Sequence, residues 1–404
     1  MIVNFSVQNF GSIKDRQTLS FEADKSKHLE DYYVINANGL RLLKLGLIYG
    51  ANASGKTTIL KALDFLRSLI LNPKHKKTDT FDDLKPFKFD NTTSNQNTLF
   101  GIEFIQDKVR YCYEIELNKE AIIREGLFSY NPKKSNVFKR TTKLQNLFTT
   151  IEFGNKIKIP KSAEEALANN TLWNNTVLGG FLKTNVDVKE LQDVINWFNA
   201  NLFPNLNDRL HYSFMPDPYN PTLDEWKKYK NEILPIIKKA DMNISDFIVE
   251  NSELKFEHIV NNEKYQLEYE LESEGTQKYF KLAYILWYAL KVPRIVSIDE
   301  LEASLHPDLF VHFLLTFLTN AKQSQIIATT HNREILNNKD IFRNDAIWIT
   351  DKTDESSTEL YSLSDFDTSV IRDTSNIYNA YKVGKLGGIP NLGDYYIDID
   401  DENE

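Results

Sequence analysis

The chain has almost no cysteine, no excess of positive charge and no long apolar run. Cys112 is the single cysteine among 404 residues, so an internal disulfide and a cysteine-based zinc cluster are both excluded, which agrees with a reducing compartment. Its place between Tyr111 and Tyr113 predicts a small core residue rather than a catalytic thiol. No apolar run is long enough for a membrane span and no basic-then-apolar leader is visible, so we expect a cytoplasmic protein without a membrane segment.

The net charge of −9 argues against a surface that is basic overall, so any affinity for nucleic acid would need a local patch. One candidate lies between residues 132 and 161, where basic residues are interleaved with Phe138 and Phe148, and Glu152 is the only acid. Such a run can hold a nucleic-acid backbone and stack bases, or it can be a solvated hairpin. The candidate contacts are Lys133, Lys134, Lys139, Arg140 and Lys143.

Residues 50–57, with the sequence Gly-Ala-Asn-Ala-Ser-Gly-Lys-Thr, have the spacing of a phosphate-binding loop. The apolar run 45–49 predicts a buried strand before the loop and residues 57–63 predict a helix after it, which is the context that the motif requires. Its glycines let backbone amides turn toward phosphate oxygens, its lysine reaches the β- and γ-phosphates, and its threonine hydroxyl can bind Mg²⁺. The expected nucleotide contacts are Gly50, Asn52, Ser54, Gly55, Lys56, Thr57 and Thr58.

A second apolar strand, residues 295–298, ends in the two carboxylates Asp299 and Glu300. At the carboxyl edge of a sheet, Asp299 is placed to bind Mg²⁺ together with Thr57, and Glu300 to orient a water molecule and take its proton. The two motifs together predict an enzyme that binds ATP with Mg²⁺ and hydrolyses it. Guanine is not favoured, because the Asn-Lys-x-Asp string is missing and residues 338–340 have the wrong spacing.

Three further segments accompany these motifs. Ser273 to Lys278 open a helical apolar stretch, Leu301 to Pro307 follow Glu300 directly, and the strand 325–330 ends in His331. Alone, a Ser-x-Gly before a helix is usually a plain cap, and a histidine after a strand is usually a surface residue. In their order along the chain, however, all five segments resemble the motifs of ABC-type ATPases, in the branch that contains SMC, RecF and the OLD nucleases.

The resemblance implies an α/β fold: an ABC-type P-loop ATPase head with a mixed parallel core sheet, an antiparallel β-subdomain and a helical insertion. It also implies a homodimer or higher homo-oligomer in which two heads sandwich ATP, with Ser273 and Gly275 of one subunit at the nucleotide of the other. Glu300 would be the general base, His331 the γ-phosphate sensor, and Ser304 part of the loop that couples the two sites. Glu274 departs from the glycine usual at its position.

The elements predict four regions. Residues 2–10 and 17–21 alternate like a hairpin, residues 98–105 and 109–117 like further strands, and most of residues 162–239 reads as helical. No sustained heptads are present in that insertion, which excludes the long coiled-coil arm of SMC-like proteins. We expect the two halves of the ATPase head at residues 1–130 and 245–350, a basic hairpin and mainly helical insertion at 131–244, and an extension with an acidic tail at 351–404.

Finer features are similar to the AbiLi/RloA-type ATPases of prokaryotic phage-defence loci. The segments that carry this similarity are 84–89, 111–115, 123–127 and 381–390. The similarity implies a sensor or scaffold subunit in abortive infection that controls a separate effector, such as a TOPRIM-like nuclease or a toxin. Two other readings stay open: a stand-alone RecF-like DNA-binding ATPase, and a scaffold in which ATP stabilises an oligomer with little turnover.

Overall fold

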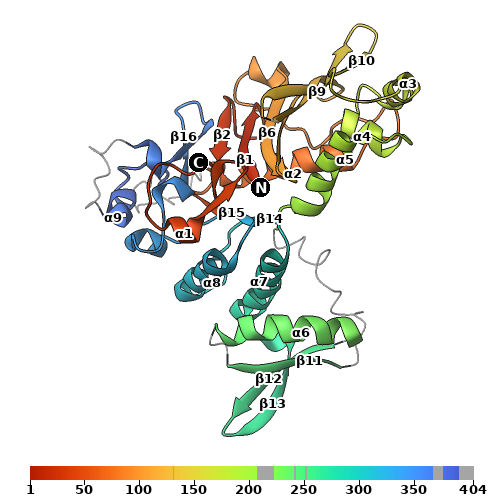
Figure 1. Cartoon of the computed structure of the whole chain (residues 1–404). Coiled ribbons are helices and arrows are strands. Elements are labelled where there is room, and N and C mark those ends of the chain that lie inside the picture. Colours follow the sequence, from red (N-terminus) through yellow and green to blue (C-terminus); the bar gives the residue numbers. More distant parts are fainter. Residues whose placement is uncertain (131, 207–222, 241–242, 251–252, 367–375, 391–404) are drawn as a thin grey trace, which may run out of the picture.

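The computed structural model describes residues 1–130, 132–206, 223–240, 243–250, 253–366 and 376–390, with only the backbone described for residues 223–227. Within them the strands form a seven-stranded, a five-stranded, a three-stranded and a two-stranded sheet (Figure 1). The expected acidic tail, residues 391–404, lies outside the described residues.

The five-stranded sheet is the parallel core, with the strand order β14, β15, β5, β16 and β17. Its strands are β5 (Leu45–Gly50), β14 (Ile295–Ile298), β15 (Gln325–Thr329), β16 (Ile347–Lys352) and β17 (Thr358–Ser362). The first four strands in the sheet order run parallel, and β17 pairs antiparallel with β16. Strands β5, β14 and β15 are buried along their whole length, as parallel strands covered on both faces are. The residues that follow these three strands therefore meet at one edge of the sheet.

The seven-stranded sheet is antiparallel, with the order β10, β9, β8, β7, β6, β1 and β2. Its strands are β1 (Ile2–Gln8), β2 (Gln17–Ser20), β6 (Thr98–Gln106), β7 (Val109–Leu117), β8 (Ile122–Tyr130), β9 (Lys134–Lys143) and β10 (Phe148–Phe153). The predicted amino-terminal hairpin and the predicted strands that became β6 and β7 are confirmed. The basic hairpin β9–β10 continues this sheet beyond residue 130.

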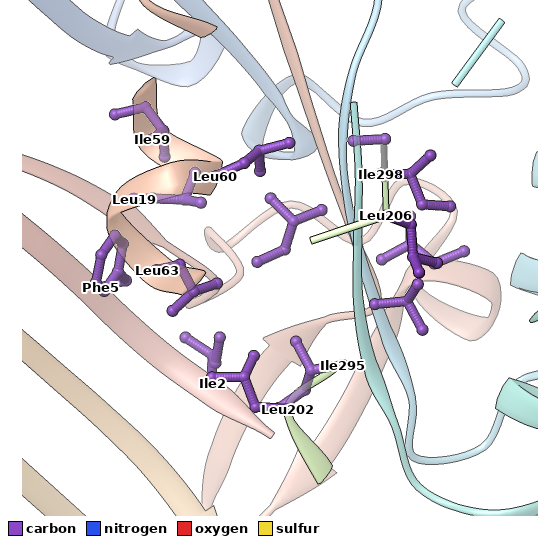
Figure 2. Packing of buried hydrophobic residues seen from close by; sticks show 14 of the residues in the cluster. Ile2, Phe5, Leu19, Ile59, Leu60, Leu63, Leu202, Leu206, Ile295 and Ile298 are labelled. Atoms are coloured by element: carbon purple, nitrogen blue, oxygen red, sulfur yellow. The ribbon is translucent and has the colours of Figure 1, made fainter. Parts of the chain in front are cut away.

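Helix α2 (Lys56–Leu71) packs between the two large sheets, against β1 on one side and β5 and β15 on the other. Figure 2 shows the helix residues Ile59, Leu60 and Leu63 beside Phe5 and Leu19 of the antiparallel sheet, with the side chain of Leu60 directed away from these two. All five side chains are buried, because one face of the helix carries apolar residues at helical spacing. The phosphate loop that precedes the helix is thereby fixed relative to both sheets.

The remaining elements lie outside the two large sheets. The helices are α1 (Glu30–Tyr33), α3 (Lys161–Asn170), α4 (Val177–Leu182), α5 (Lys189–Asn196), α6 (Leu223–Lys238), α7 (Glu274–Lys291), α8 (Pro307–Asn320) and α9 (Ile377–Lys382), with a π-helix η2 (Trp197–Asn201). The 3₁₀ turns are η1 (Thr93–Asn95), η3 (Tyr269–Leu271), η4 (Glu334–Asn337), η5 (Asn344–Ala346) and η6 (Leu363–Asp365). The remaining strands are β3 (Val34–Ala37), β4 (Leu40–Leu43), β11 (Ile244–Glu250), β12 (Glu253–Val260) and β13 (Glu263–Glu268).

The insertion uses apolar residues at helical spacing to cover the antiparallel sheet. The rings of Trp197 and Phe104 stack with their centroids 3.9 Å apart, and Leu191 and Val194 of α5 are buried. The chain then passes along the outer edge of β14, where the amides of Phe203 and Leu206 donate to carbonyls of that strand. This edge contact helps to position the end of β14.

Strands β11 to β13 form the separate three-stranded sheet, which lies with α6 and α7 at the bottom of Figure 1. Phe256 of this sheet packs against Phe280 of α7 at 5.1 Å between ring centroids. The turn between β12 and β13 has positive φ at Asn261 and Asn262, a conformation that asparagine tolerates in two-residue hairpin turns. Strand β13 leads through η3 directly into α7.

Cys112 is buried in β7, and burial together with nearby carboxylates raises the pKa of its thiol to about 12. The thiol therefore stays protonated, which agrees with a small core residue and disfavours a catalytic thiol. Among the described residues, we find no helix with the length and apolar character that crossing a membrane requires.

Gln325 joins the two large sheets, so its replacement tests how the fold is held together. Its amide oxygen accepts from the Ile2 amide at 2.6 Å, and its amide nitrogen donates to the carbonyls of Ile2 and Leu43 at 3.0 Å each. Gln325→Leu leaves these buried backbone groups unpaired, and we expect the free energy of unfolding to fall by about 3 kcal/mol in chemical denaturation. Gln323→Leu, at an exposed position nearby, is the control and should change it by less than about 0.5 kcal/mol. Equal effects of the two changes would contradict this account.

Candidate functional site

The phosphate loop leaves β5 at the carboxyl edge of the parallel sheet and ends where α2 begins. Gly55 precedes the helix with φ of 110°, a backbone conformation that favours glycine. A Cβ atom at this position would lie 2.1 Å from the Thr358 Oγ1 atom, so only glycine fits. The free amides at the start of α2 make this end of the helix suited to an anion.

Lys56 is buried, and its ammonium group folds back onto the loop. It donates to the carbonyl oxygens of Gly50 at 2.9 Å and Ala51 at 3.0 Å, both of which are neutral acceptors. Burial lowers the pKa of Lys56, whereas the nearby charges of Asp299 and Glu300 raise it. A buried cation bonded to neutral carbonyls, beside a ring of free amides, fits the phosphates of a nucleotide.

Asp299 connects three elements at the edge of the sheet. Its Oδ1 atom accepts from the Thr57 hydroxyl at 3.1 Å and from the Thr329 hydroxyl at 2.6 Å. The Thr329 hydroxyl also accepts from the amide of Glu300 at 2.8 Å, and the amide of Asp299 itself donates to the Leu206 carbonyl. The predicted pair of Thr57 and Asp299 is thus brought together.

Hydroxyl and carboxylate oxygens at this distance are ligands that Mg²⁺ accepts. Mg²⁺ is usually held by one or two protein groups together with phosphates and water rather than by a full protein cage. In keeping with this, the described residues contain no group of three or more His, Cys, Asp or Glu that could hold a metal ion. Thr57 and Asp299 therefore fit Mg²⁺ bound together with a nucleotide.

Hydroxyl groups from distant parts of the chain support the loop from behind. The Ser54 hydroxyl lies 2.6 Å from that of Thr350 on β16, and the Thr358 hydroxyl donates to the Ser54 carbonyl at 2.7 Å. The Ser12 hydroxyl lies 3.0 Å from that of Thr58. The Ser54 hydroxyl is therefore engaged in holding the loop, whereas the Asn52 side chain is exposed. Ser12, Thr350 and Thr358 could not be predicted as site residues, because no motif spacing marks them in the sequence.

The segment that contains α9 also lies against the loop. The ring of Tyr381 contacts that of Tyr49 at 5.9 Å between centroids, and the Tyr381 hydroxyl donates to the Gly388 carbonyl at 2.9 Å. A Cβ atom on Gly388 would come within 3.4 Å of the Cα atom of Gly50. The family-like segment 381–390 thus packs on the first residue of the phosphate loop.

The predicted signature segment forms a second group with the loop after Glu300. Ser273 caps α7 and accepts from the Thr276 amide at 3.1 Å. The Ser304 hydroxyl donates to the Glu274 carboxylate at 3.3 Å, and a Cβ atom on Gly275 would lie 2.8 Å from the Ser304 carbonyl. No hydrogen bond joins this group to residues 50–58 in the described part of the chain, and Figure 1 shows α7 on the far side of the parallel sheet from α2.

His331 follows β15, and its side chain is partly open to solvent and partly covered by the protein. Its backbone amide donates to the carboxylate of Glu302. Burial of the imidazole and the charge of Lys56 lower the pKa of His331, and the charges of Glu302 and Glu300 oppose this. The lowered pKa favours the neutral ring at physiological pH, and the placement of His331 at the γ-phosphate stays a prediction.

A protein-family profile described as "AAA domain, putative AbiEii toxin, Type IV TA system" matches residues 47–337. The chain belongs to this family. The matched residues run from β5 to η4 and contain the phosphate loop, both carboxylates and His331. The family is that of an AAA domain, and the sheets described above agree with the predicted α/β fold with a parallel core and an antiparallel β-subdomain.

Solved structures of SMC heads are similar over most of the chain. One is an SMC head bound to the C-terminal winged-helix domain of ScpA, with 15% identity and a TM-score of 0.49, covering 89% of this chain and 97% of that one. The SMC head of Thermotoga maritima has 12% identity and a TM-score of 0.44, with 89% and 98% covered. An SMC head with an extended coiled coil, bound to the C-terminal domain of ScpA derived from Pyrococcus furiosus, has 12% identity and a TM-score of 0.41, with 89% and 96% covered. A search of curated proteins gives no match.

The prediction that Arg140 belongs to an exposed basic patch is wrong. The side chain of Arg140 is 0% exposed and donates to the carbonyls of Leu172 and Trp173 at 3.2 and 3.0 Å, so it cannot contact nucleic acid. Side chains alternate along β9, and Arg140 points toward the insertion and Glu125, 4.0 Å away. Burial lowers the pKa of Arg140 to about 10 and raises that of Glu125 to about 7. The other four members, Lys133, Lys134, Lys139 and Lys143, are exposed.

Gly55→Ala tests whether the loop depends on the close contact with Thr358. We expect this change to lower ATP affinity at least about tenfold in calorimetric titration, because the loop must shift to admit the methyl group. Gly39→Ala is a matched control, since Gly39 also has positive φ, of 80°, but has open space around it. Unchanged ATP affinity in Gly55→Ala would show that the loop geometry is not needed for binding.

Proposed function

We propose that the chain is an ATPase that binds ATP with Mg²⁺ and hydrolyses it. The convergence of Thr57, Asp299 and Glu300 beside the buried ammonium of Lys56 supports this proposal most directly. The loop conformation, the helix start and the ligand pair each suit one part of a magnesium-bound nucleotide.

The residues of the site divide the chemistry among them. Lys56 and the amides of the loop hold the phosphates and offset the charge that develops during their transfer. Thr57 and Asp299 would hold Mg²⁺, which would supply positive charge to offset that of the phosphates. Glu300 has positive φ and an amide fixed by Thr329, which directs an exposed carboxylate outward at the sheet edge, where it can orient water and accept its proton. The neutral ring of His331 can donate a hydrogen bond to the γ-phosphate.

Ser273, Gly275 and Ser304 fit this scheme only in an assembly. Their group lies apart from the phosphate loop of its own chain, so it can serve only a nucleotide held by a second copy. The proposal therefore includes a homodimer or higher homo-oligomer in which two heads enclose ATP. Glu274 places a carboxylate, bonded to Ser304, at this surface.

We further propose that the protein is a sensor or scaffold subunit of an anti-phage abortive-infection system. The family description, which names a type IV toxin–antitoxin system, and the defence-type segments of the sequence support this role. ATP-driven engagement of the heads would hold or release a separate effector protein, such as a TOPRIM-like nuclease or a toxin. A scaffold that binds ATP but hardly hydrolyses it is the main alternative, and a base at Glu300 argues for turnover.

Two substitutions separate binding from hydrolysis. We expect Lys56→Ala to abolish ATP binding, because the buried cation is lost, and Glu300→Gln to retain binding while kcat falls by about 10²- to 10⁴-fold. Equilibrium titration with ATP and a phosphate-release assay measure the two effects. Equal rates of hydrolysis by the wild type and Glu300→Gln would reject Glu300 as the base. If both proteins bind ATP tightly and hydrolyse it slowly, the result would favour the scaffold that hardly turns over ATP.

The Glu300→Gln variant also tests the partner. Because ATP stays bound, we expect an engaged oligomer that retains a stoichiometric effector when it is isolated from the native host with ATP and Mg²⁺. Mass spectrometry and nuclease treatment identify what is retained. Nucleic acid without a protein partner would instead favour a RecF-like DNA-binding ATPase.

The outer face of the basic hairpin favours this second candidate function. Lys139 and Lys143 point outward from β9, and Phe148, which pairs with Lys143 across the hairpin, is 58% exposed. A cationic face with an exposed ring can hold a single strand by its phosphates and stack a base.

Combined charge reversal of Lys139 and Lys143 tests this face. If it binds single-stranded DNA, Lys139→Glu with Lys143→Glu should weaken binding and reduce the slope of log K against log salt by about 1.4, since two phosphate contacts are lost. Fluorescence anisotropy across a salt series measures this slope. Reversal of two other exposed lysines, Lys25 and Lys322, controls for net charge. The same affinity in both double variants would reject the patch.

A further inference from the structure

Glu302 lies two residues after Glu300, in the loop between β14 and α8, and the roles proposed above do not use it. One oxygen of its carboxylate accepts a hydrogen bond from the backbone amide of His331, 29 residues further along the chain. Because this hydrogen bond is made to the backbone, it fixes the position of the whole segment that begins after β15. The ring of His331 is positioned as part of that segment. Glu302 thus connects the loop after Glu300 to the residue expected to sense the γ-phosphate.

The second oxygen of Glu302 is buried and has no hydrogen-bond partner among the described residues. A buried carboxylate oxygen without a partner costs free energy, and buried polar groups are normally paired. A glutamine could accept the hydrogen bond from the His331 amide without the additional cost of a partly buried negative charge. The charge of Glu302 is therefore expected to have a use beyond holding the backbone.

The charged groups around His331 indicate what that use is. Lys56 of α2 and Arg333 of the same segment disfavour the imidazolium form, whereas Glu300 and Glu302 of the loop favour it. Arg333 lies over the ring of Tyr381, 5.6 Å from its centroid. Of the two carboxylates, only Glu302 is also hydrogen-bonded to His331 itself. Its charge thus acts on His331 from a fixed position.

The other end of the same loop is tied to the start of α7. Ser304 donates to Glu274, and the Ser304 carbonyl lies against Gly275. Two short turns make the loop stiff between these contacts: the Ala303 amide donates to the Glu300 carbonyl at 3.0 Å, and the Leu305 amide to the Glu302 carbonyl at 2.9 Å. A displacement of Ser304 must therefore move Glu302 and, with it, the backbone of His331.

We propose that Glu302 is a positioning residue of the ATPase site, whose carboxylate holds His331 in place and links it to the Ser273–Gly275 segment through Ser304. The inference rests on the proposed ATPase function. It makes Glu302 necessary for turnover more than for nucleotide binding. The hydrogen bond that its carboxylate accepts in the described part of the chain comes from His331, and only its charge reaches Lys56 of the phosphate loop.

Glu302→Gln removes the charge while it keeps the size of the side chain and an oxygen that can accept from His331. We expect kcat for ATP to fall by about tenfold or more, because small displacements of a catalytic group are costly, while the Kd for ATP stays within about threefold. Glu334→Gln is the matched control, since Glu334 is an exposed carboxylate three residues beyond His331. It should leave kcat and Kd unchanged. Wild-type kcat in Glu302→Gln would overturn the proposal.

A second readout does not depend on hydrolysis. In an NMR titration of ring-labelled histidine, with His331→Asn to assign the signal, Glu302→Gln should lower the pKa of His331, because a charge that favours the imidazolium form is removed. Glu334→Gln should not change it. An unchanged pKa in Glu302→Gln would overturn the proposal whether or not the protein hydrolyses ATP, whereas failure of the wild type to bind or hydrolyse ATP would reject the ATPase function itself.

Glu302→Asp keeps the charge but shortens the side chain. This variant provides a second test of the proposal if Glu302→Gln does not fold. Loss of the contact with the His331 amide should lower kcat at least about tenfold, while the pKa of His331 stays closer to the wild-type value than in a variant without the charge. Wild-type kcat in this variant would equally overturn the positioning role.

Discussion

The carboxylate of Asp299 holds the site together, because it joins three segments that are distant in sequence. It accepts hydrogen bonds from Thr57 at the start of α2 and from Thr329 at the end of β15, while its own strand β14 lies beside β15 in the sheet. Thr329 in turn fixes the amide of Glu300. The positions of the phosphate loop, the proposed base and the segment that bears His331 therefore depend on one oxygen atom of one side chain.

The fold maintains this arrangement by enclosing α2 between two sheets. The apolar face of the helix packs on the antiparallel sheet while its first turn projects from the parallel one (Figure 2). Thr350 and Thr358 support the loop from β16 and β17, and the segment after α9 packs on Gly50. These contacts offset the unfavourable free energy of burying the Lys56 ammonium group and keep the loop rigid. A rigid loop suits a site that must stabilise charge without rearranging.

Local patterns in the sequence were sufficient to predict much of the fold and of the phosphate-loop region. The phosphate loop after its buried strand, the strand that ends in Asp299 and the amino-terminal hairpin are short-range signals, and each element is found where it was predicted. Arg140 was misjudged because its segment was assessed by composition, whereas the alternation of β9 decides which side chains point outward. The roles of Thr358 and Glu302 depend on contacts with residues far away in the chain, and no spacing in a single sequence reveals such contacts.

The most direct test of the central role of Asp299 is a crystal structure with Mn²⁺ and a non-hydrolysable ATP analogue, examined by anomalous scattering of the metal. The account predicts a single Mn²⁺ peak per chain within coordination distance of the Thr57 hydroxyl and beside the Asp299 carboxylate, with the analogue's phosphates at Lys56. A nucleotide bound elsewhere, or a metal peak away from both oxygens, would contradict it.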